Sequence, residues 1–454
     1  MRKCQTKQSK KPETIRPIHY LGSKLRMLEF IGGTLDSLDP ARGTVCDLFS
    51  GSGTVSKFLS ASRKVVSIDI QEYSRVLCSA LLNPGAVEMP AADFLDAVFS
   101  SENFRALKAA FSGLIEYENR AMDGAKKGSI ENLYEIIEDG SLLKAEEYGT
   151  SGCSPAFSDV LRKTSLAVGA SGLDVTEKAM VTRYFGGLYF SYEQALQIDA
   201  ALETAYQSTQ YGTPQRDVAI AAILGATSDI VNTVGKTFAQ PLQVRDGSGK
   251  LKGNLLPKIL GDRAMPFFER LLHWLAKYHQ LEPSAAGHEI IKADYRKALE
   301  GLRGKKVSVI YADPPYTRYH YSRYYHVLET ICLRDAPEVS STFANREGMS
   351  RGIYRKDRHQ SPFSIKTKAP GAFGELFERA SAIDAPLVLS YSPTASQPAT
   401  PRMQAIDKLI EQAKSRYAEV ELRSPGYFAH SKLNAASRNF GTDTEAELLL
   451  ICRH

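Results

Sequence analysis

The chain has 454 residues, of which 43% are hydrophobic and 24% are charged, a composition that builds a sizeable core and excludes a wholly disordered protein. Its length suits two or three ordinary domains, or one enlarged domain that carries an insertion. The net charge is +6, from 57 basic and 51 acidic residues.

The sequence contains no candidate membrane anchor and no candidate secretion signal. Its longest nearly unbroken apolar stretch, residues 218–227, is shorter than the roughly 20 residues that cross a bilayer. The basic first eleven residues are not followed by the apolar core of a signal peptide. Six cysteines are scattered singly, which argues against a disulfide framework and a zinc cluster. We therefore expect a cytoplasmic protein without a metal site.

Positive charge is concentrated in two segments. Residues 1–26 hold eight basic residues and one acidic residue, and residues 345–368 hold seven and two, so the rest of the chain is net negative. Such segregation is typical of a protein with a polyanionic partner, although a solvated tail and a solvated loop would give the same count.

Residues 43–70 have the pattern of a strand, a glycine turn, a helix and a second strand. The first strand, Thr44–Phe49, ends at the turn Ser50–Thr54. Helical spacing follows over 55–62, and Val65–Asp69 is the second strand. This is the opening of a βαβ unit, which predicts a parallel sheet.

From about residue 83 to residue 288 the pattern changes to long amphipathic helices. Ser191 and Gln194 form a capping box at the start of one helix, and further helices are predicted over 213–231 and 266–279. Residues 116–158 are polar and poorly periodic, so we expect loops and short helices there.

Strand patterns return over residues 306–312, 386–392, 418–422 and 446–452. Strands at both ends of the chain imply one domain with an insertion. The predicted fold is α/β, a Rossmann-like sheet, mostly parallel and mixed at one edge, interrupted by a large, mainly helical insertion. Its expected parts are a basic flexible tail (1–14), a first α/β part (15–82), the insertion (83–288) and a second α/β part (289–454).

The glycine turn carries the first candidate binding site. It lets the backbone approach a ligand closely, and Asp69 at the end of the next strand is placed to accept hydrogen bonds from ribose hydroxyls. No third glycine follows at the spacing of a dinucleotide fingerprint, which favours an adenosine ligand without a diphosphate. Asp47 adds a carboxylate for an ammonium group. A tight packing turn is the alternative interpretation of these glycines.

The second candidate site is the run Asp313-Pro314-Pro315-Tyr316, which directly follows the strand predicted at 306–312. It therefore lies at the carboxyl edge of the sheet, where open α/β folds bind ligands. The consecutive prolines hold the Pro314 carbonyl as a rigid acceptor, and Asp313 supplies a second acceptor. Tyr316 offers a flat face for stacking. Together these groups fit a planar amino group with two N–H donors.

These motifs resemble, in the same order, those of the S-adenosylmethionine-dependent DNA adenine-N6 methyltransferases of the Dam-like (D12) class, whose aromatic-x-Gly-x-Lys cofactor segment is similar to His19–Lys24. The resemblance implies S-adenosylmethionine as cofactor and double-stranded DNA as substrate. It also implies direct in-line methyl transfer to N6 of an adenine flipped out of the duplex. The implied catalytic residues are Asp313, Pro314, Pro315 and Tyr316, and the cofactor-binding residues are Tyr20, Lys24, Asp47, Phe49, Gly51, Gly53, Asp69 and Asp294.

The resemblance also implies a biological role in restriction-modification, in phage defence or as an orphan enzyme, with a cognate restriction or defence subunit as a candidate partner. Residues 15–82 and 289–454 would form the catalytic domain, residues 83–288 would recognise the target, and residues 389–392 would line the target pocket. Two alternatives remain open. One is a methyltransferase that acts on RNA adenine N6 or on a protein amide, and the other is an inactive DNA-binding protein on this fold.

Basic residues near the second motif are candidates for contacts with DNA phosphates. Residues 317–326 alternate aromatic and basic side chains, which suits base stacking and phosphate contact, although the tyrosines also fit a buried helix face. A basic loop follows this segment, and a glycine-punctuated loop over 234–260 carries further lysines. The predicted nucleic-acid-binding residues are Arg318, Arg323, Arg351, Arg355, Lys356, Arg358, Lys236 and Lys250.

Overall fold

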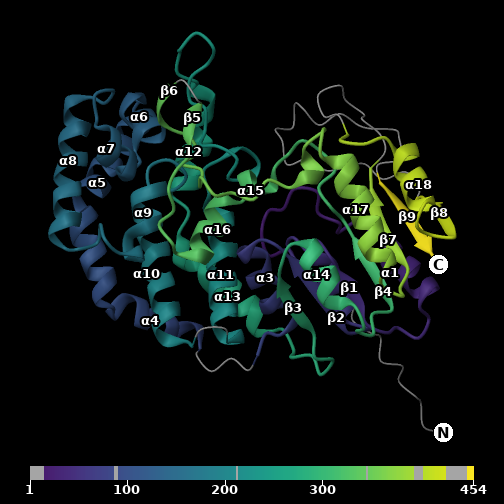
Figure 1. Ribbon diagram of the computed structural model, residues 1–454. Coiled ribbons are helices and arrows are strands. Elements are labelled where there is room, and N and C mark those ends of the chain that lie inside the picture. Colours follow the sequence, from purple (N-terminus) through teal and green to yellow (C-terminus); the bar gives the residue numbers. More distant parts are fainter. Residues whose placement is uncertain (1–14, 86–89, 211–212, 344–345, 393–401, 426–446) are drawn as a thin grey trace, which may run out of the picture.

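A computed structural model of the protein describes residues 15–85, 90–210, 213–343, 346–392, 402–425 and 447–454. The predicted flexible tail, residues 1–14, lies outside these ranges. The described chain forms an α/β sheet with helices on both faces and a large helical part at one side of it (Figure 1). The predicted fold class is therefore confirmed. Among the described residues, no helix has both the length and the apolar character that crossing a membrane requires.

The main sheet has seven strands in the order β3-β2-β1-β4-β7-β9-β8. The first five are parallel, whereas β9 runs antiparallel to both of its neighbours, so the sheet is mixed at one edge as predicted. The strands are β1 (Val45–Asp47), β2 (Val65–Asp69), β3 (Glu289–Lys292), β4 (Val309–Ala312), β7 (Leu387–Tyr391), β8 (Glu419–Arg423) and β9 (Leu448–Arg453). A separate hairpin joins β5 (Ser341–Phe343) to β6 (Arg346–Met349).

Alternate residues of the strands enter two different cores, because successive side chains point to opposite faces of a sheet. In β1, for example, Val45 packs with α1 and α2, whereas Cys46 packs on the face covered by α14, α17 and α18. Both faces are thus covered by helices, as is usual for parallel strands. The covering helices are α1 (Leu28–Leu38), α2 (Thr54–Ser60), α3 (Glu72–Leu82), α14 (Tyr295–Leu302), α17 (Ala369–Ser381) and α18 (Ile406–Lys414).

The helical part fills the left of Figure 1 and shares one hydrophobic core with α3 and α16. The predicted capping box is present, since the Ser191 and Gln194 side chains each accept a backbone N–H at the start of α10. The expectation for residues 116–158 was partly wrong, because α5 continues to residue 126 and buries one face. These helices are α4 (Ala91–Ser100), α5 (Glu102–Lys126), α6 (Glu131–Asp139), α7 (Leu142–Tyr148), α8 (Pro155–Ala170), α9 (Met180–Phe185), α10 (Tyr192–Ser208), α11 (Pro214–Ile230), α12 (Leu256–Arg263) and α13 (Phe267–His279), with α15 (Tyr321–Tyr324) and α16 (His326–Leu333) beside them.

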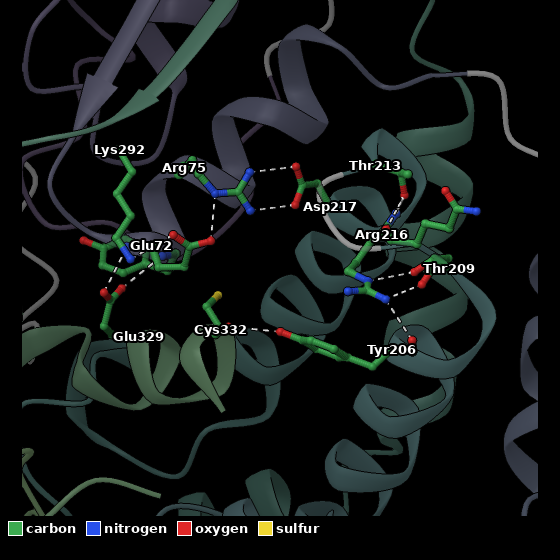
Figure 2. A network of polar contacts seen from close by, with 12 residues as sticks. Glu72, Arg75, Tyr206, Thr209, Thr213, Arg216, Asp217, Lys292, Glu329 and Cys332 are labelled. Carbon is green, nitrogen blue, oxygen red and sulfur yellow. Dashed lines mark hydrogen bonds and ion pairs between the residues drawn. The ribbon is translucent and has the colours of Figure 1, made fainter. Parts of the chain in front are cut away.

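A polar network joins the sheet to the helical part (Figure 2). On α3, the Arg75 guanidinium donates to both carboxylate oxygens of Asp217 on α11, at 2.9 and 2.8 Å. Its Nε donates to Glu72 at 2.7 Å, and Glu72 also pairs with Lys292 on β3 at 3.0 Å. Glu329 on α16 accepts the backbone N–H groups of the first two residues of α3, both at 3.0 Å. The start of α3 is therefore fixed by three neighbouring elements.

The substitution Arg75→Ala should destabilise the protein, because it leaves the buried Asp217 carboxylate without its guanidinium. Removal of one partner of a largely buried pair costs roughly 3 kcal/mol in the free energy of unfolding. Denaturant unfolding of the full chain measures this loss. Arg162→Ala is the control, because Arg162 and its partner Asp159 are both exposed on α8. Equal losses in the two variants would contradict the role assigned to the junction.

Candidate active site

The candidate site lies where the central parallel strands end. Asp47 ends β1, Asp69 ends β2, and Asp313 directly follows β4. The strand order reverses between β1 and β4, since β2 extends the sheet on one side of β1 and β4 on the other. Such a switch point opens a crevice at the carboxyl edge, where ligands bind in open α/β folds.

The glycine turn between β1 and α2 is tied to Asp69. Gly51 and Gly53 have φ of 53° and 75°, a left-handed conformation that favours glycine. The Gly51 N–H donates to Asp69 Oδ2 at 2.9 Å, and the Gln71 N–H donates to Oδ1 at the same distance. A Cβ atom on Gly51 would lie 2.5 Å from the Tyr20 hydroxyl, so the predicted cofactor segment contacts this turn.

Asp47 presents an unsatisfied acceptor beneath the turn. Its Oδ2 accepts a hydrogen bond from Ser56 Oγ at 2.6 Å, whereas the buried Oδ1 has no partner among the described residues. Burial raises the pKa of this carboxyl to about 7, and the Ser56 bond opposes the rise. A cation beside Oδ1 would favour the ionised form, so the residue fits the ammonium ligand expected from the sequence.

Aromatic rings flank the turn on its other side. The ring of Phe49 lies 5.8 Å from that of Tyr295 and 5.6 Å from that of Phe363, between ring centroids. Asp294 caps α14 by accepting the Arg296 N–H at 3.0 Å. The residue before it, Ala293, donates its N–H to the Asp69 carbonyl at 2.9 Å, which continues the pairing of β3 with β2. The structure therefore brings Phe49, Asp69 and Asp294 to the same edge.

Asp313 is held by an ion pair that links distant parts of the chain. Its Oδ2 lies 2.9 Å from Lys24 Nζ, and the same ammonium pairs with Glu447, the residue that precedes β9. Burial raises the pKa of Asp313 to about 6, with Lys24 opposing the rise and Glu447 adding to it. Glu447 is absent from the residues predicted by sequence, because no motif surrounds it.

Tyr316 lies over the same ion pair. Its hydroxyl donates to Glu447 Oε1 at 3.2 Å, and its ring lies 5.3 Å from that of Tyr391 on β7, between centroids. Ser390 also donates to Glu447 Oε1, at 3.0 Å. The strand predicted to line the target pocket therefore reaches the Asp313 motif. The Lys24 ammonium and the Arg402 guanidinium lie 5.5 and 5.2 Å from the Tyr316 centroid.

Several basic residues predicted to contact nucleic acid have internal partners. Arg355 is buried and donates to both carboxylate oxygens of Asp335 at 2.6 Å. The remaining internal contacts are those of Arg351 with the Leu242 carbonyl, Lys356 with Glu338 and Lys236 with Asp262. Arg318 and Lys250 are exposed.

Arg323 and Arg358 differ from these, because both guanidiniums lie over the ring of Tyr354, at 5.0 and 4.8 Å from its centroid. Neither has a carboxylate partner in the described part of the chain. Burial and these two guanidiniums lower the pKa of the nearby His320. Arg358 also lines a cavity of about 170 Å³ that reaches Gln71, next to Asp69.

Comparison with known proteins supports the resemblance found in the sequence. Residues 20–138 match the model of the D12 class N6 adenine-specific DNA methyltransferases. The match covers about a quarter of the chain. A matching relative, modification methylase LlaI of Lactococcus lactis subsp. lactis, is 23% identical over 260 residues. That alignment covers 56% of this chain and 35% of the relative, so the chain spans about a third of the relative's length.

Gly51→Ala should destabilise the glycine turn between β1 and α2. The left-handed conformation costs a residue with a Cβ atom roughly 1–2 kcal/mol, and the new methyl group would displace Tyr20. Thermal unfolding measures the loss. Gly33→Ala on the exposed side of α1 is the control, because nothing lies within 4 Å of its Cβ position, and it should be neutral or slightly stabilising. A Gly51→Ala variant as stable as Gly33→Ala would contradict the geometry described here.

Proposed function

We propose that the protein is a site-specific DNA methyltransferase that transfers a methyl group from S-adenosylmethionine to N6 of an adenine. The observation that carries the proposal is the position of Asp313 at the switch point of the sheet. One carboxylate oxygen is held by Lys24, and the other has no partner among the described residues. The side chain keeps 20% of its surface exposed, so a substrate group can reach it.

The residues of the crevice fit the proposed cofactor. Asp47 Oδ1 is a buried acceptor suited to an ammonium group, and Asp69 lies beside the turn, where its carboxylate would accept hydrogen bonds from ribose hydroxyls. Phe49 and Tyr295 supply apolar surface for a purine ring. When bound, S-adenosylmethionine would supply an electrophilic methyl group.

The proposed chemistry needs two acceptors at one amino group. The lone pair of an exocyclic amine is delocalised into the purine ring, which makes the nitrogen a poor nucleophile. Hydrogen bonds from its two protons to Asp313 and to the Pro314 carbonyl would favour a pyramidal nitrogen and aim its lone pair at the methyl group. Tyr316 would stack on the flipped base, whose extrusion costs a few kcal/mol. Transfer is then direct, without a covalent enzyme intermediate.

DNA is the substrate that the description of the matched family names, and we propose that this DNA is double-stranded. We propose that the helical part, residues 83–288, recognises the target sequence and that residues 15–82 and 289–454 form the catalytic domain. From the similarity to modification methylase LlaI, we also propose a role in restriction-modification, with a cognate subunit as partner.

Asp313→Ala should abolish methyl transfer, because it removes one of the two acceptors for the amino protons. The measurement is incorporation of labelled methyl groups from S-adenosylmethionine into duplex DNA, with RNA of the same sequence as a parallel substrate. Asp384→Ala is the matched control, since Asp384 is exposed near the opposite end of β7. Wild-type incorporation by Asp313→Ala would refute the mechanism, and a wild-type protein that methylates only RNA would refute the substrate.

Arg323 and Arg358 are the proposed contacts for DNA phosphates. Two adjacent guanidiniums without carboxylate partners repel each other in the free protein, and an anion between them would relieve that repulsion. Arg323 follows the Asp313 motif closely in the chain, and Arg358 lines the cavity that reaches Gln71. A backbone phosphate near the flipped nucleotide is the anion that best fits this place.

The double variant Arg323→Ala/Arg358→Ala should bind DNA with a weaker dependence on salt. Each lost phosphate contact reduces the slope of log K against log salt by about 0.9. Titrations at several salt concentrations measure the slope. Lys356→Ala, which removes an exposed cation already paired with Glu338, should leave the slope unchanged. Equal slopes for the wild type and the double variant would refute the assignment.

A further inference from the structure

Glu447 occupies a position that no sequence motif predicts, at the centre of the contacts around Asp313. It precedes β9, which is paired with β7 so that Tyr391 lies opposite Leu448. Only 4% of its surface is exposed. Its Oε1 accepts hydrogen bonds from Lys24, from the Tyr316 hydroxyl at 3.2 Å and from Ser390 at 3.0 Å.

A buried carboxylate needs partners to offset the cost of its desolvation, and Glu447 has them in three donors. Lys24 is equally buried, and its ammonium is shared between two carboxylates. Burial acts to lower the pKa of Lys24, but Asp313 and then Glu447 outweigh it, so the pKa is raised and the ammonium stays charged. Without Glu447, the Lys24 ammonium would be paired with Asp313 alone.

This sharing has a consequence for Asp313. Paired with Lys24 alone, the Asp313 carboxylate would face a full positive charge, which competes with the weak N–H donors of an amine. The second carboxylate balances that charge and fixes the ammonium on Oδ2, which leaves the other oxygen directed away from Lys24. Glu447 also holds the Tyr316 hydroxyl, and therefore the plane of the ring on which a base would stack.

We propose that Glu447 is a positioning residue for methyl transfer, which holds Lys24 and Tyr316 so that Asp313 keeps one oxygen available for the amino group of the target base. The proposal rests on the function proposed above and adds a residue to it. In this role Glu447 acts through the two side chains that it binds.

The test uses pH, because Glu447 and Lys24 act on the ionisation of Asp313 in opposite directions. Ionised Asp313 is the stronger acceptor for the amino proton that it binds, so the acidic limb of the pH profile of kcat/KM reports its pKa. Glu447→Gln removes an anion and should move this limb to lower pH by roughly one pH unit. Lys24→Met removes a cation and should move it to higher pH. The other titratable groups near Asp313 are Asp47 on β1, Tyr311 on β4, Tyr316 in the motif and Tyr321 on α15, and all four are unchanged in these variants.

Two further variants keep the test decisive. Asp384→Ala removes an exposed carboxylate near the opposite end of β7 and should leave the limb in place. The double variant Lys24→Met/Glu447→Gln should have its limb below that of Lys24→Met, a comparison that does not need Glu447→Gln to fold alone. Difference infrared titration of the cofactor-free protein, with Asp313→Asn subtracted, should show the same order of shifts without turnover.

The outcomes separate this proposal from the proposed function. Methylation by the wild type with an unmoved or upward-shifted limb in the Glu447 variants would overturn the role of Glu447 and leave the methyltransferase intact. A uniform loss of rate at every pH, without a shift, would also overturn it, because that result indicates structural support alone. A wild-type protein that methylates no nucleic acid would overturn the proposed function itself, and the infrared titration would then decide the ion-pair arrangement independently.

Discussion

The candidate site depends on the ion pairs that the Lys24 ammonium makes with Asp313 and Glu447. Carboxylates converge at the carboxyl edge of the sheet because Asp47 and Asp69 end parallel strands and Asp313 directly follows one. Glu447 reaches the same edge at the start of the antiparallel strand β9, which is paired with β7. Burying like charges together is costly unless a cation is buried with them. Lys24 meets that requirement only because the segment before α1 crosses this edge.

The segment before α1 also connects the sheet to the helical part. Tyr20 stacks on Tyr325 at 4.9 Å between ring centroids, and the Leu21 N–H donates to the Tyr325 hydroxyl at 2.7 Å. Tyr325 immediately precedes α16, whose Glu329 fixes the start of α3. The glycine turn, the segment after the Asp313 motif and the helical part are therefore positioned by one continuous set of contacts.

Local patterns predicted much of this arrangement. The strands around Asp47, Asp69 and Asp313 were predictable because each is a short apolar run that ends at a charged or glycine-rich turn. Strand β3 was not predicted, since Glu289–Lys292 is half-buried at the sheet edge and carries charged ends. Helix α5 was partly missed because its polar face outweighs its narrow apolar stripe.

Long-range partners could not be predicted in the same way. Glu447 and Lys24 are 423 positions apart, and nothing near Glu447 distinguishes it from a surface carboxylate. Partners that only the fold brings close also explain why Arg355 is neutralised and Arg323 is not. Both lie in basic segments, but only the fold places Asp335 against the first and leaves the second beside another arginine. Charge patterns in a sequence locate cations without showing which of them are already neutralised.

The place of β9 in the sheet also sets an order of assembly. It lies between β7 and β8 although it follows both in the chain, so β8 has no edge to join until β9 has paired. Such non-local pairing is slow to form. During synthesis Asp313 and Lys24 can meet earlier, as an isolated pair in which the ammonium belongs to a single carboxylate. When β9 inserts, it brings Glu447 to Lys24, so the second ion pair forms in the same step that completes the sheet.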